Sequence, residues 1–192
     1  MKRLMKVVLL SSVLGIVLAP SPARADGFFV PWAGVNFDND PADGRGSYGF
    51  SAGYMGAGVF GTEFDFGYSP RFFGDDEFFG SNNVLTAMGN LILGIPIGGT
   101  TGGGFRPYFT GGVGLIRTDI DGLFEDDAIA ENDFGWNAGG GFMAYFGDHV
   151  GIRGDLRYFR NFSDSSDVGF DNFDLDVGTL KFWRASIGLV LR

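Results

Sequence analysis

Six charged residues stand at alternate positions of three segments, a spacing that could build a network of carboxylate–guanidinium pairs. Residues two apart on a β-strand share one face, so each segment would present charge on one side and apolar or aromatic side chains on the other. Three acids and three bases make up the set: Glu63, Asp65, Arg153, Asp155, Arg157 and Arg184.

This balance of charge permits two interpretations. A buried charge is tolerated only when it is paired and hydrogen-bonded, so the six residues could form a salt-bridge network that fills the interior of a barrel and fixes its register. Alternatively, an arginine that exchanges one carboxylate for another could gate a narrow pore.

Enzymatic chemistry is not predicted, because the necessary groups lie too far apart. Nucleophilic catalysis needs a base within reach of the nucleophile. The only histidine, His149, is separated from Ser163, Ser165 and Ser166 by one expected strand, which is about 30 Å. The sequence lacks the Gly-x-Ser-x-Gly, phosphate-loop and His-Glu-x-x-His motifs, and it has no cysteine for disulfides, thiolate metal sites or nucleophiles. We expect no catalytic residue, no cofactor and no metal site.

Residues 1–25 have the composition of a secretory signal peptide. Basic residues at positions 2, 3 and 6 precede an apolar run over residues 7–18, and Ala23-Arg24-Ala25 provides a small-x-small cleavage site. The run is shorter than the roughly 20 residues that a membrane-spanning helix needs, although an N-terminal anchor helix is the alternative. We expect cleavage before Asp26 and one domain over residues 26–192.

The remaining composition is acidic and rich in glycine and phenylalanine. Without residues 1–25 the chain keeps 10 basic and 23 acidic residues, a formal charge of −13. Nucleic acid is therefore excluded as a partner, because phosphate backbones require a basic face. The 34 glycines and 22 phenylalanines follow no collagen period, and the aromatic content excludes disorder. Glycine between aromatic and β-branched residues favours the closely packed strands of a small barrel.

Stretches of about ten residues with alternating character predict an all-β fold. An even number of such strands is what a closed transmembrane barrel requires, because lipid offers no partner for an unpaired sheet edge. We predict an eight-stranded antiparallel up-and-down transmembrane β-barrel. Its strands are expected near residues 27–37, 46–56, 59–69, 83–97, 104–118, 133–147, 149–162 and 178–191.

The connections indicate which solvent surrounds the barrel. Alternate links are short (54–59, 98–104 and 147–149), and the others are long and acidic (38–44, 70–82, 119–133 and 161–176). Short turns at one end and long loops at the other are typical of outer-membrane barrels, whose outer face is apolar and whose lumen is polar. With the N-terminus on the periplasmic side, all four long loops would lie outside the cell.

Aromatic residues occupy the expected outer faces, several near strand ends, where girdles form at the lipid–water interface. Two phenylalanine pairs, Phe72-Phe73 and Phe78-Phe79, fall in the second long loop instead, where they could pack on the loop or the barrel rim, or form a patch for a partner or a membrane. The outer-face aromatics are Tyr48, Phe50, Tyr54, Phe64, Phe66, Tyr68, Phe109, Phe142, Tyr158 and Trp183.

Residues 26–192 resemble the small eight-stranded outer-membrane β-barrel family that includes the N-terminal domain of outer membrane protein A. The resemblance implies a bacterial outer-membrane location and insertion by the outer-membrane assembly machinery, and we expect a monomer. It is specific to the fold and not to an activity. The segments that carry it are 27–30 with Gly34, 64–69, 106–108 with 111–115, 139–145 and 156–158.

Two features depart from that family. Its members usually end in an aromatic residue that the assembly machinery recognises, whereas this sequence ends Leu189-Val190-Leu191-Arg192. The large homologues also carry a soluble peptidoglycan-binding domain. No residues remain for such a domain after the eighth strand, so that role is not carried over.

The acidic loops have two possible roles. The segment from Asp38 to Gly44 begins like a calcium-binding loop but lacks the closing glutamate. The loops could be solvated surface, or their oxygens could hold divalent ions that bridge to lipopolysaccharide phosphates. The other clusters are Asp121, Glu125, Asp126 and Asp127, and Asp164, Asp167, Asp171, Asp174 and Asp176.

Three functional hypotheses remain open. The first is a non-enzymatic outer-membrane barrel with a plugged, salt-bridged lumen, which contributes to envelope integrity or surface interaction through its acidic loops, in contact with outer-membrane lipid and lipopolysaccharide. The second is a narrow gated channel or transporter for ions or small solutes. The third is a soluble periplasmic barrel that binds an apolar ligand. Only the first two require Phe64 and Leu156 to face outward while Asp65 and Arg153 face inward.

Overall fold

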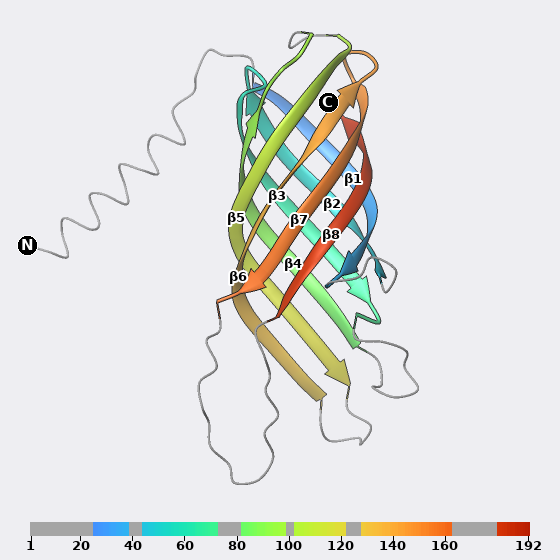
Figure 1. Cartoon of the computed structure of the whole chain (residues 1–192), viewed down its shortest axis with the longest axis vertical. Helices are drawn as coiled ribbons and strands as arrows, with labels where there is room; N and C mark the ends of the chain where they lie inside the picture. The colour runs from blue at the N-terminus through green and yellow to red at the C-terminus, as the bar shows by residue number, and fades with distance from the viewer. Residues whose placement is uncertain (1–24, 39–43, 73–81, 99–101, 122–127, 163–179) are drawn as a thin grey trace, which may run out of the picture.

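The alternating segments form eight β-strands, each paired antiparallel with its neighbours in sequence, and β1 also pairs with β8 to close a barrel (Figure 1). This confirms the predicted all-β, eight-stranded antiparallel barrel. The computed structural model describes residues 25–38, 44–72, 82–98, 102–121, 128–162 and 180–192. The strands are β1 (Ala25–Phe37), β2 (Arg45–Gly56), β3 (Phe60–Pro70), β4 (Asn82–Gly94), β5 (Gly104–Asp121), β6 (Ala128–Tyr145), β7 (Val150–Asn161) and β8 (Lys181–Leu191).

The strand ends differ from the prediction mainly at three places. β4 ends at Gly94 because Pro96 has no N–H to donate to the ladder. Beyond it, Ile97 forms only an isolated bridge with Phe105. β5 extends to residue 121 and β6 begins at residue 128, because their backbone pairing continues to Asp121 and Ala128. Backbone hydrogen bonds do not depend on side-chain type, so the alternating pattern did not reveal this extension.

The two ends of the barrel differ in their connections. Short turns join β2 to β3, β4 to β5 and β6 to β7, and the start of β1 and the end of β8 lie at the same end (Figure 1). We call this the turn end and the opposite one the loop end. In the tightest turn, which has three residues between Gly56 and Phe60, Ala57 and Gly58 both have positive φ (50° and 69°), as the central residues of a type I′ turn do.

Several predictions fall on residues that are not described. They include most of the expected signal peptide, and Phe73, Phe78 and Phe79 of the phenylalanine pairs. Residues Asp40 and Asp43 also lie outside the described ranges, as do Glu125, Asp126, Asp127, Asp164, Asp167, Asp171, Asp174, Asp176, Ser163, Ser165 and Ser166. No helix in the part of the chain that is described is long and apolar enough to cross a membrane.

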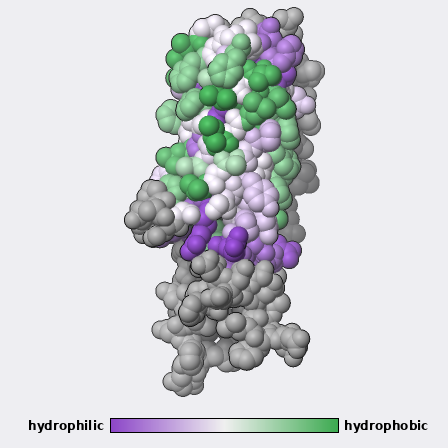
Figure 2. Space-filling model, turned by 90° about the vertical axis from the view of Figure 1, so that its right-hand side faces the viewer, coloured by the Kyte–Doolittle hydropathy of each residue, from purple (hydrophilic) through white to green (hydrophobic). Residues whose placement is uncertain are grey.

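The barrel wall is apolar on its outside. Phe64 and Leu156 are 47% and 44% exposed, whereas Asp65 and Arg153 on the same strands are buried. All ten aromatic residues predicted for the outer face lie there, exposed or half-buried. Figure 2 shows hydrophobic residues spread over the wall, with strongly hydrophilic ones near its two ends. This arrangement is opposite to that of a soluble barrel, so the soluble-barrel hypothesis is wrong.

The interior has three layers. An apolar turn-end cluster and an apolar loop-end cluster lie at the two ends, and charged and polar side chains lie between them. A polar, salt-bridged lumen was expected, and the two apolar clusters were not. The turn-end cluster is Phe28, Val30, Met55, Ile92, Tyr108, Met143, Tyr145 and Val190, and the loop-end cluster is Val84, Met88, Ile116, Phe159 and Phe182.

Candidate functional site

The structure brings all six predicted charged residues together in the middle of the barrel interior. Two come from β3, three from β7 and one from β8, because alternate positions of each strand point inward. All are buried, with Asp155 the most exposed at 8%. We call Glu63, Asp65, Arg153, Asp155, Arg157 and Arg184 the charge layer.

Arg157 lies at the centre of the charge layer and reaches all three acids. Its Nη2 is 2.7 Å from Glu63 Oε1, its Nε is 2.7 Å from Asp155 Oδ1, and its Nη1 is 3.9 Å from Asp65 Oδ2. A guanidinium presents five donors in a rigid fork, so one arginine can link carboxylates on opposite walls.

Arg153 and Tyr108 form a second set of contacts on the turn-end side. Arg153 Nη1 donates to Glu63, and its Nη2 is 3.1 Å from Asp155 Oδ2. Its Nε donates to Tyr108 Oη at 2.6 Å, and the Tyr108 hydroxyl in turn donates to Asp155. The Arg153 guanidinium also lies over the Tyr108 ring, 4.8 Å from its centroid.

Arg184 forms the loop-end side of the layer. Its Nη2 is 2.5 Å from Asp65 Oδ1. The guanidinium lies between two aromatic rings, 4.2 Å from the centroid of Trp32 and 4.7 Å from that of Phe159. The two rings stabilise the Arg184 guanidinium by cation–π attraction, in addition to its ion pair with Asp65.

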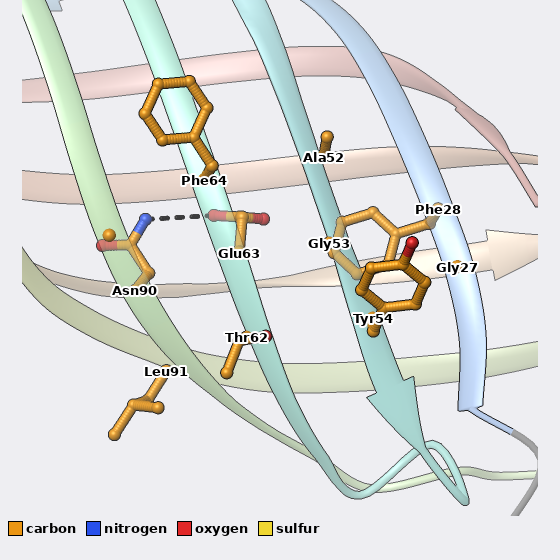
Figure 3. Close-up of a pocket in the computed structure, with 11 residues that line it drawn as sticks. Gly27, Phe28, Ala52, Gly53, Tyr54, Thr62, Glu63, Phe64, Asn90 and Leu91 are labelled. Carbon is orange, nitrogen blue, oxygen red and sulfur yellow. Dashed lines mark hydrogen bonds between the residues drawn. The ribbon is translucent and has the colours of Figure 1, made fainter. Parts of the chain in front are cut away.

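Polar side chains complete the carboxylates. Ser51 Oγ donates to Asp65 Oδ2 at 2.8 Å, and Asn90 Nδ2 donates to Glu63 Oε1 at 3.2 Å (Figure 3). Asn137 then donates to Asn90 Oδ1 at 2.7 Å. Sequence reasoning missed these residues and also Tyr108 and Trp32, although all of them occupy inward positions of their strands.

Figure 3 also shows a groove beside Glu63 and Asn90. It has a volume of about 600 Å³ and lies on the outer side of β2, β3 and β4, where Ala52 and Gly89 are small between Tyr54, Phe64 and Leu91. Glu63 is the one member of the charge layer among its lining residues, and the small cavity inside that layer is separate from the groove.

Little free space remains inside the charge layer. The cavity bounded by Trp32, Asp65, Arg153, Arg157 and Arg184 has a volume of about 10 Å³, which is about the space that one water molecule needs. Formal charges also balance, with three acids and three arginines in contact. Pairing of this kind is what a buried charge requires.

Aromatic side chains cover the loop end of the charge layer. Phe159 and Phe182 stack at a centroid distance of 4.9 Å, and Phe72 packs edge-on against Phe182 at 5.1 Å. Phe72 therefore packs on the barrel rim, as one of the two interpretations predicted.

A buried arginine that the sequence reasoning missed lies in the turn-end cluster. Arg106 is 3% exposed, its guanidinium lies over the Tyr145 ring at 5.2 Å, and its Nη1 is 3.6 Å from Met55 Sδ. Arg192 lies over the same ring at 4.8 Å and pairs with Asp26. The alternation of Arg106 with Phe105 and Pro107 was the signal that could have found it.

Of the groups considered for catalysis, only His149 lies within the described residues. His149 is exposed in the turn between β6 and β7. Within those same ranges, no cluster of three or more histidine, aspartate or glutamate side chains could hold a metal ion.

Comparison with known proteins gave one family and several solved structures. The family model described as "Outer membrane protein beta-barrel domain" matches residues 11–181. Comparison with curated protein sequences gave no match. Similar structures include surface protein A of Neisseria (TM-score 0.61, 13% identity, covering 87% of this chain and 97% of that one). They also include the N-terminal β-barrel domain of OprF of Pseudomonas aeruginosa (0.51, 18%, 88% and 98%).

A third similar structure is Ail, the attachment invasion locus protein of Yersinia pestis, in complex with the heparin analogue sucrose octasulfate. Its TM-score is 0.50 at 11% identity, covering 85% of this chain and 96% of that one. At these identities the likeness concerns the fold alone, and it agrees with the apolar wall and closed strand order seen here.

Proposed function

Because the chain belongs to the outer membrane protein beta-barrel domain family and is located in the bacterial outer membrane, we propose that it is a non-enzymatic barrel with a plugged lumen. In this proposal it contributes to envelope integrity or to surface interaction, with the turn end in the periplasm and the long acidic loops outside the cell. Lipid and lipopolysaccharide surround the apolar wall, the assembly machinery inserts the chain, and the barrel is a monomer.

The filled interior is the single observation that supports the plug most strongly. The charge layer has room for about one water molecule, and apolar clusters lie on both sides of it. Eight-stranded barrels have an interior just wide enough for side chains. Ion passage would therefore require charged groups to separate in a medium where separation is costly.

A narrow gated channel is the second candidate, and the position of Arg157 favours it. Because this guanidinium lies within 4 Å of all three acids, a small rotation would exchange one carboxylate for another without leaving it unpaired. Such an exchange would open a path only if both apolar clusters also moved.

Single-channel recording in planar bilayers separates the two candidates. For the plugged barrel we expect no reproducible openings, and none after Arg153→Gln or Arg157→Gln in barrels that remain folded. Regular openings in the native chain that change in conductance on these substitutions would overturn the plug and support the channel.

Permeability of whole cells tests the physiological part of the proposal. A deletion strain should become more sensitive to detergent and to large antibiotics, and expression of the native chain should restore resistance. The control is the Arg117→Gln variant, which changes an exposed residue of β5. Its expression should restore resistance as well as expression of the native chain does. Normal permeability of the deletion strain would count against the integrity role.

A further inference from the structure

Two basic residues stand directly opposite each other on the outer wall. Arg160 of β7 and Lys181 of β8 are cross-strand partners, and both are exposed. The Cβ atoms of such partners lie about 4.5–5.5 Å apart, and like charges at this spacing destabilise a sheet. No carboxylate of the described residues forms an ion pair with either of them.

Another basic residue of the same rim is compensated within the chain. Arg117 of β5 is also exposed near the loop end, and its Nε donates to both carboxylate oxygens of Asp119, at 3.0 and 3.1 Å. Arg160 and Lys181, in contrast, have no such carboxylate partner among the described residues, so a bound anion would reduce the repulsion between them.

Neighbouring aromatic rings fix the depth of this basic pair. Tyr158 and Trp183 are also cross-strand partners, two residues farther from the loop end, with ring centroids 5.2 Å apart. Trp136 of β6 continues the row at 5.6 Å from Tyr158. Tyrosine and tryptophan collect at the lipid–water interface. Two residues along a strand cover about 6.8 Å, so a strand tilted by 35–45° raises the basic pair by about 5 Å above this row, to the level of lipid headgroups.

The surroundings of the pair are apolar on the loop side as well. Phe134 and Phe162 are 64% and 56% exposed there, and the Phe162 N–H donates to the Phe134 carbonyl at 2.8 Å. Apolar rings therefore lie on the loop side of the basic pair as well as on the side of the aromatic row.

We propose that Arg160 and Lys181 bind a phosphate group of an outer-leaflet lipopolysaccharide, whose acyl chains lie against the aromatic row. The guanidinium matches two phosphate oxygens in a fork geometry, and the ammonium adds a compact charge beside it. The site rests on the proposed function only in that the loop end must face the outer leaflet. This proposal places the lipopolysaccharide contact on two basic residues of the wall. From the sequence, the acidic loops were considered for this contact instead.

The test uses the full chain, refolded in detergent micelles, with native mass spectrometry to count bound lipid. The probes are diphosphorylated lipid A and the same lipid with both phosphates removed. The native chain should prefer the phosphorylated lipid. The double variant Arg160→Gln with Lys181→Gln should bind it roughly 10- to 30-fold more weakly, from about 1 kcal/mol per basic residue near a charged surface. Arg117→Gln should bind as the native chain does.

Two outcomes would overturn the site. One is an unchanged preference in the double variant. The other is no preference in the native chain, which is the result expected if aspartates of residues 163–179 neutralise the pair. Heat-modifiable migration on gels, measured on every variant, shows that each barrel is folded. Because folding and conductance are read separately, loss of this site would leave the plugged barrel standing.

Discussion

Arg157 on β7 and Glu63 on β3 form an ion pair across the barrel interior, with Arg157 Nη2 2.7 Å from Glu63 Oε1. Three strands separate β3 from β7 in either direction around the barrel, so the pair joins opposite walls. Backbone pairing cannot make such a link, because each strand bonds only to its neighbours. The ion pair therefore fixes the position of β3 relative to β7, which are not hydrogen-bonded to each other.

Removal of this central arginine should be costly. Arg157→Gln leaves Arg153 as the one remaining arginine that contacts both Glu63 and Asp155, so three buried carboxylates face two arginines. Breaking one side of a buried pair typically destabilises a protein by about 3–5 kcal/mol. Urea unfolding in lipid vesicles, followed by tryptophan fluorescence, measures the loss. Arg117→Gln, whose ion pair with Asp119 is exposed, should change stability by less than about 1 kcal/mol. Equal unfolding midpoints for the two variants would contradict a structural role for Arg157.

Alternation made the charge layer predictable, because on β3, β7 and β8 charged residues share one face and bulky ones the other. The contribution of β4 was not predictable in the same way. Ile92 faces inward and Leu91 and Leu93 outward, so both faces are apolar and the alternation disappears. Tyr108 was missed because only charged residues were considered for the interior network, although its hydroxyl bonds with Arg153 and Asp155 explain its burial.

The hydroxyl of Tyr108 should stabilise the charge layer apart from its ring. Tyr108→Phe keeps the ring over Arg153 but removes the hydroxyl that accepts from Arg153 Nε and donates to Asp155. Arg153 and Asp155 remain in direct contact, but a buried partner left unsatisfied costs about 1–3 kcal/mol. The control is Tyr48→Phe on the outer wall, where the residue is 55% exposed and we expect almost no change. Vesicle unfolding curves for both variants decide the point. A Tyr108→Phe barrel as stable as the native one would show that the hydroxyl bonds contribute nothing.

Inward glycines should be intolerant of a side chain beside the charge layer. A Cβ at Gly141 would lie 2.1 Å from the Gly154 carbonyl oxygen and 2.8 Å from Tyr108 Oη, whereas one at Gly89, on the outer face, would meet nothing closer than 3.8 Å. We expect Gly141→Ala to destabilise the barrel by about 1–3 kcal/mol through overpacking, and Gly89→Ala to be nearly neutral. The same unfolding assay compares them. A stable Gly141→Ala barrel would mean that this part of the interior is more loosely packed than its distances indicate.

The loop-end cluster and the charge layer should act as separate barriers. Phe182 stacks on Phe159 and contacts Phe72, and truncation of a buried phenylalanine to alanine costs about 3–5 kcal/mol. Phe182→Ala should therefore unfold at lower urea concentration, yet remain non-conducting in planar bilayers because the ion pairs of Arg157 are untouched. Phe134→Ala, on the outer wall, controls for loss of an aromatic ring without loss of interior packing. Openings that appear with Phe182→Ala alone would place the barrier in the aromatic cluster, and the charge layer would then have to be regarded as permeable.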